Sequence, residues 1–76
     1  MRKEFEHDEY MFLAMHQKEG RKQTIGEIHN ILPLVAGSRG MLAVAVSTLE
    51  KLEDLTDAEF DSMDLKPYQA ALLEGR

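Results

Sequence analysis

Cysteine and tryptophan are absent from this chain, and proline occurs only twice. Without cysteine, the chain can form neither a disulfide nor a zinc site with thiolate ligands. No apolar run approaches the roughly 18 residues that a membrane-spanning helix requires. A chain of 76 residues allows one small domain with a thin core. The sequence therefore predicts a single domain over residues 1–76, stabilised by helix packing or by self-association.

The start of the chain is acidic rather than basic. Four of its first nine residues carry a carboxylate: Glu4, Glu6, Asp8 and Glu9. A secretory signal peptide begins with a positively charged segment. We therefore expect a soluble cytoplasmic protein that does not contact a membrane.

Charge is uneven along the chain. Residues 1–46 hold six acids and six Lys/Arg, whereas residues 47–76 hold eight acids and three bases, so the net charge of −5 lies in the second part. Proteins that bind duplexes usually place a basic stripe against the phosphates. The only basic cluster here is Lys18, Arg21 and Lys22. The charge distribution argues against nucleic-acid binding, and these three residues are the fallback contacts if it occurs.

The first half of the chain predicts two helices. One runs from about Glu4 to Glu19 and is ended by Gly20, and its middle, residues 10–15, is apolar on every side. Such a helix is enclosed by neighbours or contributes to an interface. Thr24-Ile25-Gly26-Glu27 fits a capping box and predicts the start of a second helix. Pro33 should end or kink that helix after about eight to ten residues.

The third predicted helix is the most periodic segment. It starts at Ser38, a plausible N-cap, and continues to about Asp54. Its expected apolar stripe consists of Leu42, Ala45, Val46, Leu49 and Leu52, at steps of three and four. Its expected polar side consists of Ser47, Thr48, Glu50, Lys51, Glu53 and Asp54.

A second capping box, Thr56-Asp57-Ala58-Glu59, predicts a short fourth helix that carries Phe60 and Met63. Lys66-Pro67 should close this element. Residues 69–76 are expected to form a further helical turn or a frayed tail. The predicted fold is therefore all-α, a small bundle of three main helices plus a short fourth.

No group of residues has the spacing of a catalytic or metal site. His7 and His16 are nine residues apart on one helix, so they point to opposite sides, and no H-E-x-x-H pattern occurs. Paired carboxylates such as Glu50 and Asp54 are typical of a solvated helix face. We expect no enzymatic activity, no cofactor and no metal.

The second and third predicted helices, joined by a glycine-containing turn, have the outline of a helix-turn-helix. The third would be the recognition helix, and its outward residues are mainly Glu50, Glu53 and Asp54. Carboxylates are repelled by a phosphate backbone. A small DNA-binding or transcriptional accessory domain is therefore the alternative interpretation, not the preferred one.

Several large and adaptable apolar residues occur together: Tyr10, Met11, Phe12, Met15 and Met41. Core packing is the ordinary role of such residues, but methionine is also over-used at adaptable binding surfaces. A bundle this small should leave part of residues 10–15 accessible. The candidate protein-interaction surface is therefore Tyr10, Met11 and Met15, facing an unknown protein partner or a second copy of the chain.

Residues 49–67 also follow a familiar pattern. Leu49, Lys51 and Leu52 form an L-x-K-L helix end, Thr56 to Phe60 form T-D-x-E-F, and Met63-Asp64-Leu65 precede Pro67. This pattern resembles the C-terminal half of the transposon-transfer assisting protein family, small proteins of conjugative elements in Firmicutes. The resemblance implies a role in the transfer of a mobile element and brings no catalytic residue with it.

Overall fold

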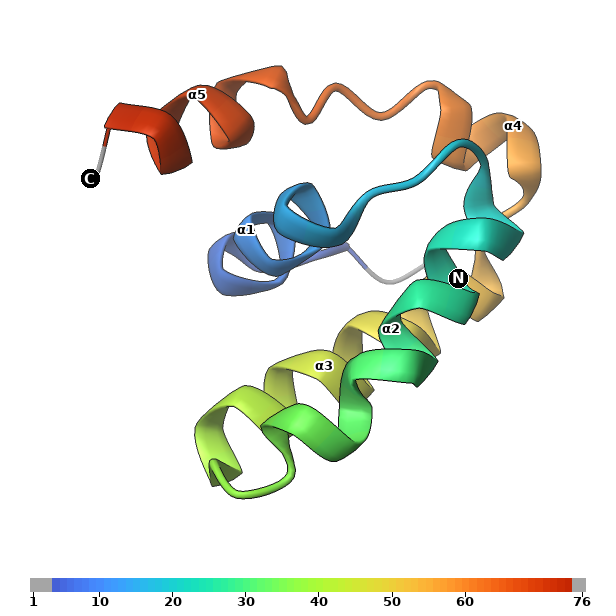
Figure 1. Cartoon of the computed structure of the whole chain (residues 1–76). Coiled ribbons are helices and arrows are strands. Elements are labelled where there is room, and N and C mark those ends of the chain that lie inside the picture. Colours follow the sequence, from blue (N-terminus) through green and yellow to red (C-terminus); the bar gives the residue numbers. More distant parts are fainter. Residues whose placement is uncertain (1–3, 75–76) are drawn as a thin grey trace.

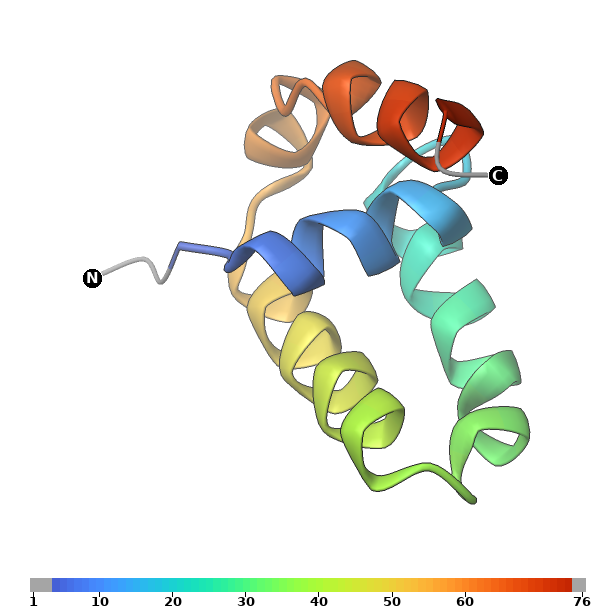
Figure 2. The ribbon, with the colours of Figure 1, turned by 90° about the vertical axis from the view of Figure 1, so that its left-hand side faces the viewer.

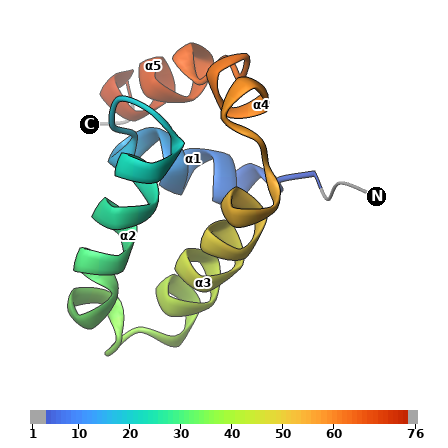
Figure 3. The ribbon, with the colours of Figure 1, turned by 90° about the vertical axis from the view of Figure 1, so that its right-hand side faces the viewer.

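The computed structural model describes residues 4–74, which form five helices and no strand. These are α1 (His7–His16), α2 (Arg21–Val35), α3 (Arg39–Asp54), α4 (Asp57–Asp61) and α5 (Lys66–Glu74). α2 and α3 lie side by side and antiparallel, joined by a short turn (Figures 2 and 3). α1 crosses one face of this pair, and α5 lies on the other side of α1 (Figure 1). The all-α prediction is confirmed.

The central position of α1 explains its apolar middle. Phe12, Leu13 and Ala14 are buried, because α1 is packed between α5 and the α2–α3 pair. The helix is shorter than predicted at both ends. Glu6 precedes it, with its amide donating to the Glu9 carboxylate at 2.7 Å, and the backbone becomes extended at Gln17.

The predicted capping box at Thr24 is wrong. α2 begins one turn earlier, with Gly20 at its N-cap in a positive-φ conformation (φ 88°). The Thr24 hydroxyl is fully buried; it donates to the Gly20 carbonyl (2.9 Å) and accepts from the Lys18 amide (3.0 Å). Because the glycine permits this tight turn, the threonine side chain closes the α1–α2 connection instead of capping a helix.

Pro33 does not end α2, which is 15 residues long and continues to Val35, so the predicted length of eight to ten residues is also wrong. Proline removes the hydrogen bond to the carbonyl of His29. It does so in the last turn of α2, and His29 is exposed to solvent. A water molecule can satisfy a carbonyl in that position, so the helix tolerates the loss for two further residues.

α3 starts as predicted. The Ser38 hydroxyl accepts from the Met41 amide at 3.3 Å. The buried face of α3 is rotated from the predicted stripe. Val46 is 41% exposed, whereas Thr48, expected on the polar side, is fully buried. Both α1 and α2 pack on α3, so its buried sector is wider than one stripe and turns toward α1. Leu49 is buried as expected.

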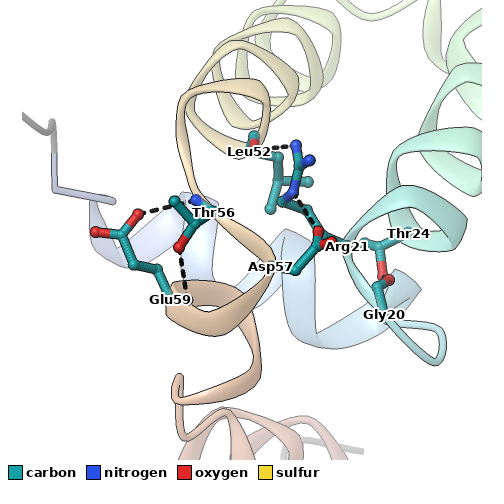
Figure 4. Close-up of polar contacts among 7 residues, drawn as sticks. All are labelled: Gly20, Arg21, Thr24, Leu52, Thr56, Asp57 and Glu59. Atoms are coloured by element: carbon teal, nitrogen blue, oxygen red, sulfur yellow. Dashed lines mark hydrogen bonds and ion pairs between the residues drawn. The ribbon is translucent and has the colours of Figure 1, made fainter.

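The capping box at Thr56 is confirmed. The Thr56 hydroxyl accepts from the Glu59 amide (3.0 Å), and the Glu59 carboxylate accepts from the Thr56 amide (2.9 Å) (Figure 4). This box starts α4, which is only five residues long and buries Phe60. Met63 lies after the helix rather than in it, and is half-buried.

Residues 69–74 belong to α5, a nine-residue helix that is longer than the predicted turn or tail. The helix begins at Lys66, so Lys66-Pro67 opens an element instead of closing one. Proline fits the first helical turn, where its missing amide would have no intrahelical partner. Residues 75 and 76 of the predicted tail lie outside the described residues. Across residues 4–74, every helix is too short or too polar to span a lipid bilayer.

Candidate protein-interaction surface

The three residues of the predicted interaction surface lie on two different sides of α1. Tyr10 stacks on Tyr68 of α5, with ring centroids 4.9 Å apart and planes 15° apart. Met11 and Met15 line a hollow between α1 and α3. The structure thus brings Met11 and Met15 together and places Tyr10 in the contact that holds α5.

This hollow, the α1–α3 groove, has a volume of about 440 Å³. α1 crosses the α2–α3 pair near the end where α3 finishes, so the first turns of α3 extend beyond it (Figure 2). The groove lies in the angle between α1 and these first turns of α3. Its lining consists of Asp8, Met11, Phe12 and Met15 from α1 and Ser38, Gly40, Met41 and Val44 from the start of α3.

The apolar side chains of the groove are partly open to solvent. Met15 is 56% exposed, although it belongs to α1, the central helix of the fold. Met41, on α3, is 40% exposed. The Ser38 hydroxyl already accepts the Met41 amide, and Asp8 is the only charged residue of the lining. The groove therefore offers an apolar surface with a single carboxylate at its edge.

A nearly buried ion pair outside the groove lining fixes α1 against α3. The Glu9 carboxylate accepts from the Lys51 ammonium at 2.5 Å and from the Ser47 hydroxyl. Lys51 also donates to the Glu4 carbonyl at 3.0 Å. The Glu9 and Lys51 side chains are only 7% and 12% exposed. The position of Lys51 corrects its predicted place on the polar side of the third helix.

The pKa of Glu9 reflects this environment. Burial by itself raises the pKa of this carboxyl, because the charged form loses its hydration. The hydrogen bonds from Lys51, Ser47 and the Glu6 amide outweigh burial and hold the pKa of Glu9 below its ordinary value of 4.5. Glu9 is therefore a paired carboxylate that orients α1, and it is poorly suited to donate or accept a proton in a reaction.

The basic cluster lies at the α1–α2 turn, away from the groove. Arg21 donates to the Asp57 carboxylate (2.9 Å) and to the Leu52 carbonyl (3.1 Å), so its guanidinium joins α2 to the α3–α4 junction (Figure 4). Lys18 and Lys22 are exposed. The hollows around them are also lined by Glu19, Asp57 and Asp61.

The three histidines lie in separate places. His7 faces the ring of Tyr68 at 5.8 Å, His16 packs on Phe12 at 4.7 Å, and His29 is exposed. Burial lowers the pKa of His16, while the nearby Glu27 carboxylate acts in the opposite direction. Within residues 4–74, no three His, Asp or Glu side chains are grouped so that they could hold a metal ion.

Sequence reasoning missed two parts of this region. Met41 was recognised as adaptable, but its place beside Met11 and Met15 depends on the angle at which α1 crosses α3, which no local pattern encodes. The Glu9–Lys51 pair joins residues 42 positions apart. No local sequence pattern links two residues so far apart in the chain.

Comparison with known proteins identifies a family. The sequence model of the family described as Putative transposon-transfer assisting protein (TTRAP) matches residues 5–67. No curated protein and no solved structure matches the chain significantly. The matched segment includes α1 to α4 and therefore both walls of the groove. With most of its length matched in this way, the chain belongs to the transposon-transfer assisting protein family.

Proposed function

We propose that this protein assists the transfer of a conjugative transposon as a non-enzymatic adaptor that holds another protein in the α1–α3 groove. The family description supports a transposon-related accessory role. The observation that carries the proposal is the groove itself, where Met11, Met15 and Met41 form one accessible apolar surface. Exposed apolar patches bordered by polar residues are typical of interaction sites.

The titratable groups support an adaptor rather than an enzyme. The buried carboxylate, Glu9, is held ionised by Lys51 and Ser47. The partly buried imidazole, His16, packs on Phe12 and is not part of the groove lining. A general acid or base needs a pKa near the working pH and access to a substrate. The groove offers apolar contact instead.

The charge distribution supports a protein partner over a DNA partner. Of the three predicted fallback contacts for nucleic acid, Lys18, Arg21 and Lys22, Arg21 is already bonded to Asp57 and to a backbone carbonyl. Outward residues of α3 such as Glu50 and Glu53 are exposed carboxylates. A duplex laid against α3 would meet like charge. The protein is proposed to act in the cytoplasm of the donor cell.

Transfer frequency tests this function. In a donor whose copy of the gene is deleted, wild-type protein should restore transfer, and the double variant Met15→Lys/Met41→Lys should not. The matched control is Val46→Lys/Leu73→Lys, which adds the same two charges at exposed apolar positions outside the groove. This control should restore transfer like the wild type.

Equal transfer by both double variants would contradict the proposed function. So would a loss of transfer on substituting Lys18 and Lys22 with Ala, together with DNA binding that weakens steeply with salt in an electrophoretic assay. That combination would favour the DNA-binding alternative.

A further inference from the structure

The length and walls of the groove fit a helix. Asp8, Met11, Phe12 and Met15 occupy positions i, i+3, i+4 and i+7 of α1, so this wall is two turns or about 10 Å long. Met41 and Val44 form the opposite wall, one turn of α3. Two helices that meet at an angle leave a channel into which a third can place its side chains. A partner helix that fills this length would present apolar residues at i, i+3 or i+4, and i+7.

The chemistry of the walls favours an adaptable, apolar fit. Three methionines supply most of the contact surface, and their flexible thioethers can repack around different side chains. At Gly40 the position of a Cβ is open space, with no atom within 4 Å, so a partner can approach the backbone there. The polar residues of the lining, Asp8 and Ser38, are both exposed, so the lining contains no buried polar group that lacks a partner.

The negative charge at one end of the groove favours a positively charged partner. Asp8 lines the groove, and Glu4 and Glu6, just before it in the chain, are also exposed carboxylates. Glu9, in contrast, is neutralised by Lys51. On α3, Arg39 lies in the chain between the lining residues Ser38 and Gly40; it is exposed and is not part of the lining. A cation beside the apolar anchors would therefore meet complementary charge.

We propose that the α1–α3 groove binds a basic amphipathic α-helix of another protein, with its apolar face on Met11, Met15 and Met41 and a lysine or arginine against Asp8. This inference rests on the proposed function, because it names the kind of partner that the adaptor holds. A second copy of this chain is a poorer occupant, since its helices α3 to α5 carry the acidic surplus of the molecule.

Fluorescence anisotropy with labelled 18-residue peptides tests the proposal. The probe places leucines on one helical face and lysines on its flanks. One control peptide replaces the lysines with glutamates, and another has the same composition in an order that spreads the leucines around the helix. The wild-type protein should bind the probe at least about tenfold more tightly than either control.

Two pairs of protein variants locate the binding. Met41→Lys should weaken binding of the probe at least about tenfold, whereas Val46→Lys, on the same helix and equally exposed, should change it less than about twofold. Asp8→Asn should weaken the probe about three- to tenfold and reduce its salt dependence. Glu53→Gln removes the same charge from an exposed site on α3 and should leave binding unchanged. Circular dichroism melts confirm that each variant is folded.

The proposal is overturned if the glutamate peptide or the scrambled peptide binds as tightly as the probe, or if Val46→Lys weakens binding as much as Met41→Lys. It is also overturned if the protein dimerises in sedimentation and Met15→Lys abolishes the dimer, since the occupant is then a second copy. The proposed role in transfer can fail independently of this inference. If the peptides bind as expected and the groove variants still support transfer, the inferred partner stands and the proposed function fails. If the groove variants lose transfer but the wild-type protein does not bind the probe, the proposed function stands and the inferred partner fails.

Discussion

Replacing Lys51 with Met should destabilise the fold more than any other change of a charged side chain in α3. The substitution keeps most of the aliphatic stem and removes the ammonium, which lies 2.5 Å from the Glu9 carboxylate and 5.8 Å from the centre of the Phe5 ring. Glu9 then remains as a nearly buried carboxylate, with the Ser47 hydroxyl and the Glu6 amide as its donors.

The magnitude follows from this burial. Breaking a buried ion pair by removing one partner costs about 3–5 kcal/mol. Lys51 keeps 12% exposure and Glu9 keeps two donors, so we expect a loss near the lower end, about 3 kcal/mol. A chain of this length has a total stability of about 4–11 kcal/mol. The melting temperature should fall by about 12–24 °C.

Thermal and urea unfolding measure this loss, with Lys66→Met as the matched control. Lys66 is exposed at the start of α5, so the same change there should cost less than about 0.5 kcal/mol. Adding Glu9→Gln to Lys51→Met should recover part of the loss, because the carboxamide needs no counter-charge. Equal destabilisation by the two lysine substitutions would refute the reasoning, since it would mean that Lys51 is not paired with a buried charge.

The same pair predicts a pH dependence. The pKa of Glu9 in the folded protein is below its ordinary value of 4.5, so the unfolded chain takes up this proton first as pH falls. The stabilisation from Glu9 is therefore present above pH 4.5 and is lost as pH falls through the folded pKa. Glu9→Gln should flatten the stability profile in this acidic window, as measured by urea unfolding at a series of pH values.

Four further substitutions test other parts of the structure by the same unfolding measurements. Leu49→Ala should cost about 2–5 kcal/mol because it opens a cavity at a buried site, and an unchanged melting temperature would contradict its place in the core. Thr56→Ala should cost about 0.5–2 kcal/mol through loss of the N-cap of α4; a neutral effect would disprove the cap. Arg21→Ala should cost about 1 kcal/mol, since it removes two hydrogen bonds, whereas exposed Lys22→Ala should be nearly neutral. Thr48→Val should stabilise by about 1 kcal/mol, because the buried Thr48 hydroxyl has no partner among the described residues; destabilisation would show that this hydroxyl is satisfied.

Short sequence patterns predict correctly the start of a helix whose N-cap depends only on neighbouring residues. Ser38 and Thr56 cap α3 and α4 because each hydroxyl needs only an amide three residues ahead. The signal at Thr24 has the same form, but the tight turn at Gly20 offers its hydroxyl nearer backbone partners, and that competition is invisible in a four-residue pattern. Caps are therefore predictable only where no adjacent turn competes for the side chain.

The features that the sequence does not predict depend on contacts between helices that are far apart in the chain. The rotated face of α3, with Thr48 buried and Val46 exposed, follows from α1 packing beside α2, and no periodicity within α3 encodes a second neighbour. α5 is too short to be stable alone, and it is held by packing against α1 that includes the stacking of Tyr68 on Tyr10. The lining of the groove has a local part and a tertiary part: Met11 and Met15 are one helical turn apart on α1, and Met41 joins them only through the crossing of α1 and α3.

The methyl signals of the methionines test the central claim most directly. Of the four methionines within residues 4–74, Met11, Met15 and Met41 line the groove, and Met63 follows α4 outside it. Protein labelled with ¹³C only at methionine methyl groups can be titrated with the basic amphipathic peptide and followed by NMR. The account predicts that the three groove signals shift together with one dissociation constant while Met63 stays in place. Groove signals that do not move at saturating peptide, or a Met63 signal that moves as far as they do, would contradict it.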